Sequence, residues 1–306
     1  MARIAIVGAG AIGAVAASLL QAAGGHELAL CVRRPLAGLV VETTAVGMSS
    51  RVEEEIRPET AVKASIWTQP EEASPVDWVL VATKAYDVEA AARWLEWLCG
   101  ETTPVAVLQN GVEHCERFRP YIPAHRIVPV IVDCPAERRE ARKGVDRVAQ
   151  RGPMSLRVPA GGLGEEFVAL FAGSQADAAV SADWTTVAWK KLCLNTAGVL
   201  SALVAKPAGI LREEEMGELA LELVRECAAV GRAEGATLDE DIAEQVLASS
   251  RRASPDSVNS LLADRLAGRP MEIDARNGAV VRLGKKHGIA TPANAMAAGL
   301  LRAMAG

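Results

Sequence analysis

The feature that most limits how this chain can fold is a glycine-rich turn at residues 8–13, with the sequence GAGAIG. The run at residues 3–7 precedes it and is typical of a strand, while residues 11–23 follow with the apolar periodicity of a helix. A GxGxxG pattern between a strand and a helix is the arrangement of a dinucleotide-binding domain. We therefore predict a Rossmann-type domain, with a plain glycine turn as the alternative.

The residues of this turn have distinct expected roles. Gly8 permits the tight turn, Gly10 lets the backbone approach a pyrophosphate, and Gly13 lets the helix pack closely on the strand. Ala11 and Ile12 open the helix, whose unpaired N–H groups face the phosphates. We expect all five residues to bind the cofactor.

The end of the second predicted strand indicates which dinucleotide binds. Domains that bind NAD usually place Asp or Glu there, which accepts a hydrogen bond from the ribose 2′-OH. Here residues 28–32 run into Arg33 and Arg34 without an acid at the end of the strand. A guanidinium matches a 2′-phosphate in charge and geometry, so we predict NADP as the cofactor, with Arg33 in contact and Arg34 in support. A solvated basic loop is the alternative.

The chain changes character near residue 180. Before it, short apolar runs alternate with helical patterns at residues 11–23 and 88–99, which implies a parallel sheet covered on both faces. The predicted strands are residues 3–7, 27–32, 78–82, 105–108 and 127–132. After residue 180, amphipathic segments separated by Pro or Gly predict helices only. These predicted helices are residues 184–204, 213–233, 239–250, 257–266, 272–287 and 293–304. The predicted fold class is α/β, with an N-terminal NADP-binding Rossmann domain (residues 1–180) and an all-α C-terminal substrate and catalytic domain (residues 181–306).

Composition narrows the classes of function. The formal net charge is -5, which gives no electrostatic reason to expect nucleic acid as a partner. We find no signal-peptide pattern and no apolar run long enough to span a bilayer, so we expect no membrane association and a cytoplasmic location. The six cysteines and four histidines lack the spacing of metal ligands, so we expect free thiols and no metal.

Six further motifs run in order through nearly the whole chain. They are KAYD at 84–87, LQNGV at 108–112, WKKLCLN at 189–195, SVNS at 257–260 followed by Asp264, EIDARNG at 272–278, and LGKKHGIATP at 283–292. Each motif is short, but their common order is far more specific than any one of them. Together they resemble the ketopantoate reductase (2-dehydropantoate 2-reductase) family. The resemblance implies an enzyme that reduces a 2-oxo acid to a 2-hydroxy acid with NADPH.

The resemblance also implies two catalytic residues, Lys191 and Glu272. Lys191 would be the general acid, because hydride delivery to a ketone carbon leaves negative charge on oxygen that a proton donor or cation stabilises. Glu272 would contact the substrate and the nicotinamide side of the cofactor, and its charge would keep the lysine cationic. The alternatives are a surface lysine and an acidic residue that stabilises a helix N-terminus.

Four other positions would bind ligands according to the same resemblance. Lys84 and Asn110 would lie at the mouth of the nicotinamide pocket, since both follow the carboxyl ends of strands. Asn110 and Lys191 would also contact substrate. Asn195, four residues after Lys191 and hence on the same helix face, would hydrogen-bond substrate, and Ser260 would hold the substrate carboxylate.

Two positions depart from the family pattern. Members that reduce ketopantoate typically carry two further asparagines, which by spacing fall on Val199 and near Ala208. Neither side chain here can form a hydrogen bond. We predict reduction of ketopantoate to pantoate, with another small or bulkier 2-oxo acid as one alternative and a catalytically silent NADP-binding sensor or scaffold as the other. The helices could pack within one chain or across a homodimer.

Overall fold

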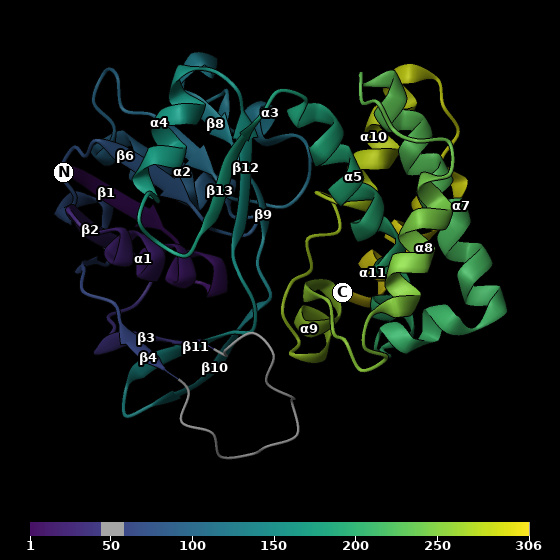
Figure 1. The fold of residues 1–306 in the computed structure, drawn as a ribbon, viewed down its shortest axis with the longest axis horizontal. Helices are drawn as coiled ribbons and strands as arrows, with labels where there is room; N and C mark the ends of the chain where they lie inside the picture. Colours follow the sequence, from purple (N-terminus) through teal and green to yellow (C-terminus); the bar gives the residue numbers. More distant parts are fainter. Residues whose placement is uncertain (44–57, 306) are drawn as a thin grey trace. The chain divides into compact units, whose positions relative to one another are not determined.

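The structure is a computed structural model that describes residues 1–43 and 58–305 (Figure 1). Its internal contacts divide the chain into two compact units. The sheet unit comprises Met1–Gln109 and His114–Ala182, and the helical unit comprises Asn110–Glu113 and Asp183–Gly306. Every strand of the described residues belongs to the sheet unit.

The largest sheet of the sheet unit has the strand order β5-β2-β1-β6-β7-β8, and all of its neighbouring strands are parallel. Its strands are β1 (Ala2–Val7), β2 (His26–Cys31), β5 (Ser65–Trp67), β6 (Trp78–Val81), β7 (Val105–Val107) and β8 (Ile127–Pro129). The predicted parallel sheet is therefore confirmed. The order reverses between β1 and β6, and open α/β sheets bind ligands beyond the carboxyl ends of their strands at such a switch point.

Helices cover both faces of this sheet. Successive side chains of a strand point to opposite faces, and in β1 the buried Ile4 and Ile6 belong to one apolar cluster while Ala5 and Val7 belong to another. The helix α1 (Ala11–Ala23) packs into the first cluster and α2 (Val88–Leu98) into the second. Both helices confirm the predicted segments.

Two smaller sheets complete the sheet unit, and the sequence patterns did not predict them. One has the order β10-β11-β3-β4, formed by Ala136–Arg142, Val145–Gln150, Gly38–Thr43 and Glu59–Ala61. The other has the order β13-β12-β9, formed by Asp177–Ser181, Ser155–Pro159 and Ile131–Asp133, and α4 (Gly162–Leu170) lies between β12 and β13 in sequence. The single strand predicted at residues 127–132 is wrong, because β8 ends at Pro129, which has no N–H for the ladder, and β9 joins another sheet.

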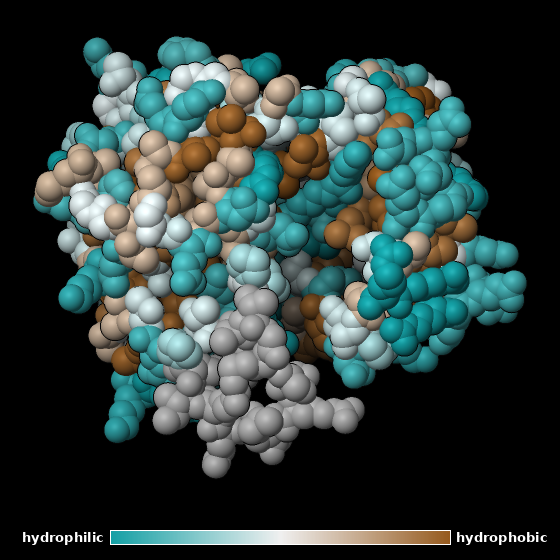
Figure 2. Space-filling model, in the orientation of Figure 1, coloured by the Kyte–Doolittle hydropathy of each residue, from teal (hydrophilic) through white to brown (hydrophobic). Residues whose placement is uncertain are grey.

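The helical unit consists of helices and short turns. Its α-helices are α5 (Trp184–Ala197), α6 (Val199–Val204), α7 (Glu214–Ala233), α8 (Ile242–Arg252), α9 (Ser260–Leu266), α10 (Asn277–His287) and α11 (Pro292–Ala305). They enclose an apolar core that includes Trp189, Leu223, Cys227 and Leu301. Hydrophilic side chains cover most of α7 and α8 on the face shown in Figure 2, as expected for the outer sides of amphipathic helices.

The segment Trp184–Val204 is, by length and composition, apolar enough to cross a membrane, with a mean hydropathy of 1.2. The expectation that the chain contains no such run is therefore wrong. However, 56% of the most apolar window of this segment is buried inside the protein. It packs as the core helix of a folded unit, and a break at Gly198 separates it into α5 and α6.

Candidate active site

The glycine-rich turn follows β1 in the sheet unit and opens α1. Gly8 has a positive φ of 101°, which favours glycine, and a Cβ on Gly13 would lie only 2.0 Å from the Gly8 carbonyl oxygen. By contrast, a Cβ on Gly10 would meet nothing within 4 Å. Gly8 and Gly13 are thus required by the fold itself, whereas Gly10 leaves open space beside the turn.

The N-terminus of α1, where Ala11 and Ile12 lie, is suited to an anion. Its N-cap residue, Gly10, has no side chain that could cap it, and its first turn contains no acidic residue. The first N–H groups of a helix have no partner within the helix, and with the helix dipole they attract phosphate groups. The turn and the helix N-terminus therefore fit a dinucleotide pyrophosphate.

The two arginines after β2 differ in their surroundings. The Arg33 side chain is 88% exposed, and its guanidinium lies 4.0 Å from the Asp87 carboxylate. Arg34 Nη2 donates to both carboxylate oxygens of the buried Asp146, at 2.6 and 2.8 Å. Arg33 is thus placed to meet a ligand beyond β2, whereas Arg34 is bound to a side chain of the fold.

Lys84 is half-buried in the segment that follows β6. The backbone of this segment is held by Gln109, which is 5% exposed. Gln109 Nε2 donates to Thr83 Oγ1 at 3.2 Å and to the Lys84 carbonyl oxygen at 3.3 Å. Gln109 was not assigned a role from the sequence, although it stands in the LQNGV motif beside Asn110.

In the helical unit, Asn110 contacts Glu272. Asn110 Nδ2 donates to Glu272 Oε2 at 2.9 Å, and Glu272 is only 4% exposed. Glu272 directly precedes the turn at residues 273–276 that leads into α10, and α10 begins at Asn277 rather than at residue 272 as predicted. Glu272 therefore does not lie in the first turn of α10 and does not fit the alternative of a residue that stabilises a helix N-terminus. The burial of Glu272 against the Asn110 amide supports a role in the candidate site instead.

Lys191 and Asn195 lie four residues apart on α5, both half-buried. The preceding residue, Lys190, contacts Asp239 with 3.7 Å between Nζ and Oδ2. Consecutive helical residues point about 100° apart, so Lys190 and Lys191 occupy different sides of α5.

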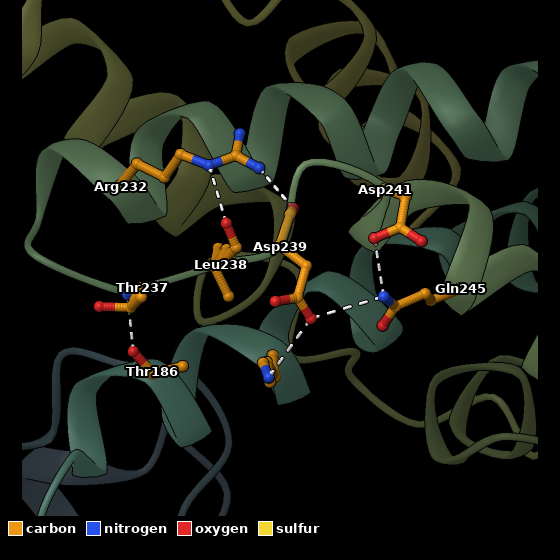
Figure 3. Close-up of polar contacts among 8 residues, drawn as sticks. Thr186, Arg232, Thr237, Leu238, Asp239, Asp241 and Gln245 are labelled. Atoms are coloured by element: carbon orange, nitrogen blue, oxygen red, sulfur yellow. Dashed lines mark hydrogen bonds and ion pairs between the residues drawn. The ribbon is translucent and has the colours of Figure 1, made fainter.

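A loop between α7 and α8 holds α5 in place (Figure 3). Thr237 N donates to Thr186 Oγ1 of α5 at 2.7 Å. Arg232 fixes the same loop, because its guanidinium donates to the carbonyl oxygens of Leu238 at 3.2 Å and Asp239 at 2.6 Å. These bonds position the helix that carries Lys191.

Ser260 is exposed at the start of α9. Its neighbour Asn259 caps this helix by accepting from Leu262 N at 3.0 Å, and Asn259 Nδ2 donates to the Gly198 carbonyl oxygen at 2.9 Å. Because Gly198 directly follows α5, this bond joins the start of α9 to the end of the helix that carries Lys191. A hydrogen bond within the helical unit thus connects the segment of Ser260 with the helix that carries Lys191 and Asn195.

A buried arginine that the sequence interpretation did not assign lies beside Ser260. Arg276 is 3% exposed, and its Nη2 donates to Ser260 Oγ at 2.7 Å. Burial lowers the pKa of the Arg276 guanidinium, while the charges of Glu272 and Asp264 act in the opposite direction. Its position within the EIDARNG motif was the only sequence signal for it.

The two positions that depart from the family pattern have different environments. Val199 is fully buried in the core of the helical unit. Ala208 is half-buried at the start of η3 (Ala208–Arg212). Neither position offers a polar side chain to a ligand.

The parallel sheet with its open glycine turn, together with a helical unit that carries lysine, asparagine, serine and a buried glutamate, defines a nicotinamide-dinucleotide oxidoreductase. Comparison with family models is more specific. Residues 4–159 match the model of ketopantoate reductase PanE/ApbA, and residues 183–305 match the model of its C-terminal region. The chain belongs to the ketopantoate reductase PanE/ApbA family, as the resemblance of its motifs predicted.

Individual proteins that are similar to this chain are ketopantoate reductases as well. A 2-dehydropantoate 2-reductase of Caulobacter vibrioides is 50% identical over 307 residues, which cover 100% of both chains. The crystal structure of a PanE/ApbA family ketopantoate reductase from Ralstonia eutropha JMP134 is 30% identical, with a TM-score of 0.84 and coverage of 99% of this chain and 98% of that one. A dimeric ketopantoate reductase from Staphylococcus aureus shares the fold, with 23% identity, a TM-score of 0.81 and coverage of 98% of each chain. The family reduces ketopantoate with NADPH, so the chain is an NADP-dependent oxidoreductase.

Proposed function

We propose that this chain reduces 2-dehydropantoate (ketopantoate) to pantoate. Ketopantoate, NADPH and one proton are converted to pantoate and NADP⁺. The observation that carries the proposal is the arrangement of α5, on which Lys191 and Asn195 lie one turn apart in a chain that belongs to the ketopantoate reductase family.

The sheet unit is assigned to the cofactor. Gly8, Gly10 and Gly13, with the N–H groups of Ala11 and Ile12, would bind the pyrophosphate. Arg33 would bind the 2′-phosphate, and Lys84 would contact the nicotinamide half. Asn110, which belongs to the helical unit, would contact the nicotinamide half as well. When bound, NADPH supplies a hydride to the carbonyl carbon. Support for this assignment comes from the open space at Gly10 and the exposure of Arg33.

Lys191 is assigned as the proton donor. Its Nζ would give a proton to the carbonyl oxygen as negative charge develops there, and its positive charge would stabilise that oxygen before transfer. Asn195, on the same face of α5, would donate a hydrogen bond to the substrate. Glu272 would favour the protonated form of the lysine and orient the Asn110 amide, to which it is already bonded.

Ser260 is assigned to the substrate carboxylate. Ser260 is an exposed residue at the start of α9, and a hydroxyl donates readily to a carboxylate oxygen. We infer that residues 1–180 form the cofactor domain, apart from Asn110–Glu113 of the helical unit, and that residues 181–306 form the substrate domain.

We also propose that the protein acts as a cytoplasmic homodimer, without nucleic acid or membrane partners. Met296, Leu300 and Met304 form an exposed apolar stripe on α11, at 57%, 48% and 48% exposure. Such a stripe suits contact with another helix. Light scattering after size exclusion measures the mass directly, and a monomer at micromolar concentration would exclude this assembly.

The reaction is tested by following NADPH oxidation with a set of 2-oxo acids and identifying the products by mass spectrometry. We expect ketopantoate to be reduced to pantoate with the highest kcat/KM of the set. A higher kcat/KM for a bulkier 2-oxo acid would replace the substrate but keep the chemistry. NADPH binding without oxidation by any of them would instead support a silent sensor or scaffold.

A further inference from the structure

A buried cation lies directly behind the serine assigned to the substrate carboxylate. Arg276 is 3% exposed, whereas Ser260, which accepts from Arg276 Nη2 at 2.7 Å, is exposed. Arg276 Nε is buried and has no hydrogen-bond partner among the described residues. A guanidinium placed this deeply is costly unless charges or hydrogen bonds compensate it.

This contact fixes which way the serine hydroxyl can act. A guanidinium has only donors, while a serine hydroxyl has one proton and two lone pairs. Ser260 must therefore accept from Arg276, and its own proton turns away from the guanidinium. The exposed side of Ser260 thus presents a donor, and a charge-assisted bond on the other side of the oxygen polarises it further.

Two carboxylates share the surroundings of Arg276, and each has a second partner. Asp264 Oδ1 accepts from Arg269 Nε at 3.0 Å, and Glu272 Oε2 accepts from Asn110 Nδ2 at 2.9 Å. Both carboxylates are 4% exposed. They stabilise the buried guanidinium, which in turn donates to the hydroxyl of the exposed residue Ser260.

We propose that Arg276 is a positioning residue for the substrate carboxylate, which fixes the Ser260 hydroxyl as a donor and polarises that hydroxyl with its positive charge. The inference rests on the proposed function, in which Ser260 binds that carboxylate. It makes Arg276 a determinant of specificity for acids over neutral ketones of the same shape.

The test compares 2-oxo-3,3-dimethylbutanoate, the analogue of ketopantoate with hydrogen in place of the hydroxyl, with its methyl ester, which lacks the negative charge and has no hydroxyl that could form a lactone. kcat and KM are measured for both compounds in the original chain and in Ser260→Ala, Arg276→Met and Arg269→Met. Arg269→Met is the matched control, because it removes a guanidinium from the same cluster without touching Ser260. Arg276→Met should lower the acid-to-ester ratio of kcat/KM by about tenfold or more, the range for a charge-assisted hydrogen bond, mainly through the KM of the acid.

The double variant Ser260→Ala/Arg276→Met should lose little beyond Ser260→Ala, because Arg276 acts through the hydroxyl. An unchanged ratio in Arg276→Met, with a reduced ratio in Ser260→Ala, would overturn the inference and leave the proposed function standing. An unchanged ratio in Ser260→Ala would remove Ser260 from the proposed function as well.

Arg276→Met removes a positive charge that compensates the buried carboxylates of Asp264 and Glu272, and this variant could fail to fold. In that case Asp264→Asn/Arg276→Met is compared with Asp264→Asn alone, because the neutral amide removes one of the uncompensated charges. The same tenfold loss of the ratio is expected, and equal ratios in this pair would contradict the role of Arg276.

Discussion

At the scale of single residues, Arg33 is expected to determine the choice of cofactor. Arg33→Ala should narrow the preference for NADPH over NADH by about tenfold or more, because a charge-assisted bond to the 2′-phosphate contributes roughly 1.5–3 kcal/mol. Fluorescence titration of both cofactors measures the ratio of the two Kd values. Equal affinity for NADPH and NADH in the original chain would contradict the assignment.

Arg34→Ala is the control for this prediction. Arg34 is bonded to the buried Asp146, so its loss should lower the Tm modestly, because the buried carboxylate loses one of its two arginine partners. The ratio of Kd values should stay close to that of the original chain. A ratio that falls as far as in Arg33→Ala would mean that both arginines bind the phosphate.

We expect recognition of the substrate hydroxyl to be weak, because Val199 and Ala208 stand where the family pattern has asparagines. A site without partners for this hydroxyl loses about 1–3 kcal/mol, so ketopantoate should gain little over 2-oxo-3,3-dimethylbutanoate, its analogue with hydrogen in place of the hydroxyl. The measurement is kcat/KM for the two compounds. A preference for ketopantoate above about a hundredfold, near 2.7 kcal/mol, would mean that other residues bind the hydroxyl.

The sequence could identify site residues where a motif carries them, and it could not identify those that act through a neighbour. Lys191 and Asn195 have the spacing of one helix face, which the structure confirms. Arg276 and Gln109 stand in recognised motifs, but their contacts to Ser260 and Thr83 join segments 16 and 26 residues apart. No local pattern encodes a hydrogen bond between two such loops.

At the scale of elements, the junction of β1 and α1 allows a paired test. Gly13→Ala would place a Cβ 2.0 Å from the Gly8 carbonyl oxygen, so β1 and α1 must separate, and we expect a lower Tm or insoluble protein. Gly10→Ala meets nothing within 4 Å, so its Tm should be nearly unchanged while NADPH affinity falls, because the methyl group occupies space that the pyrophosphate needs. Undiminished NADPH binding by Gly10→Ala would contradict the placement of the cofactor at this turn.

Elements whose apolar residues repeat with a clear period could be predicted from the sequence. Elements that form only by pairing with another segment could not. The helix at residues 11–23 was predicted to the residue, because its small apolar side chains repeat with helical spacing. The strand β10 has the charged sequence AERREAR and is mostly exposed. It forms by pairing with β11 through a turn at Lys143 and Gly144, both at positive φ, and such pairing is not visible in an apolar pattern.

At the scale of the whole molecule, the proposed function divides its work between two units of different architecture. The sheet unit carries the glycine turn and Arg33, and the helical unit carries Lys191, Glu272 and Ser260. Cofactor binding and proton transfer should therefore be separable by substitution. A catalytically silent NADP-binding protein would need cofactor binding but not proton transfer.

The most direct test of the account compares Lys191→Ala with Lys190→Ala, two adjacent lysines of α5. For both variants, kcat for NADPH-dependent reduction of ketopantoate and the Kd of NADPH are measured. Lys191→Ala should lower kcat by about 10²–10⁴-fold, the range for loss of a positioned proton donor, with little change in the Kd of NADPH. Lys190→Ala, which removes an exposed contact to Asp239, should keep nearly full activity. Near-normal turnover of Lys191→Ala, or an equal loss in both variants, would contradict the assignment of Lys191 as the proton donor.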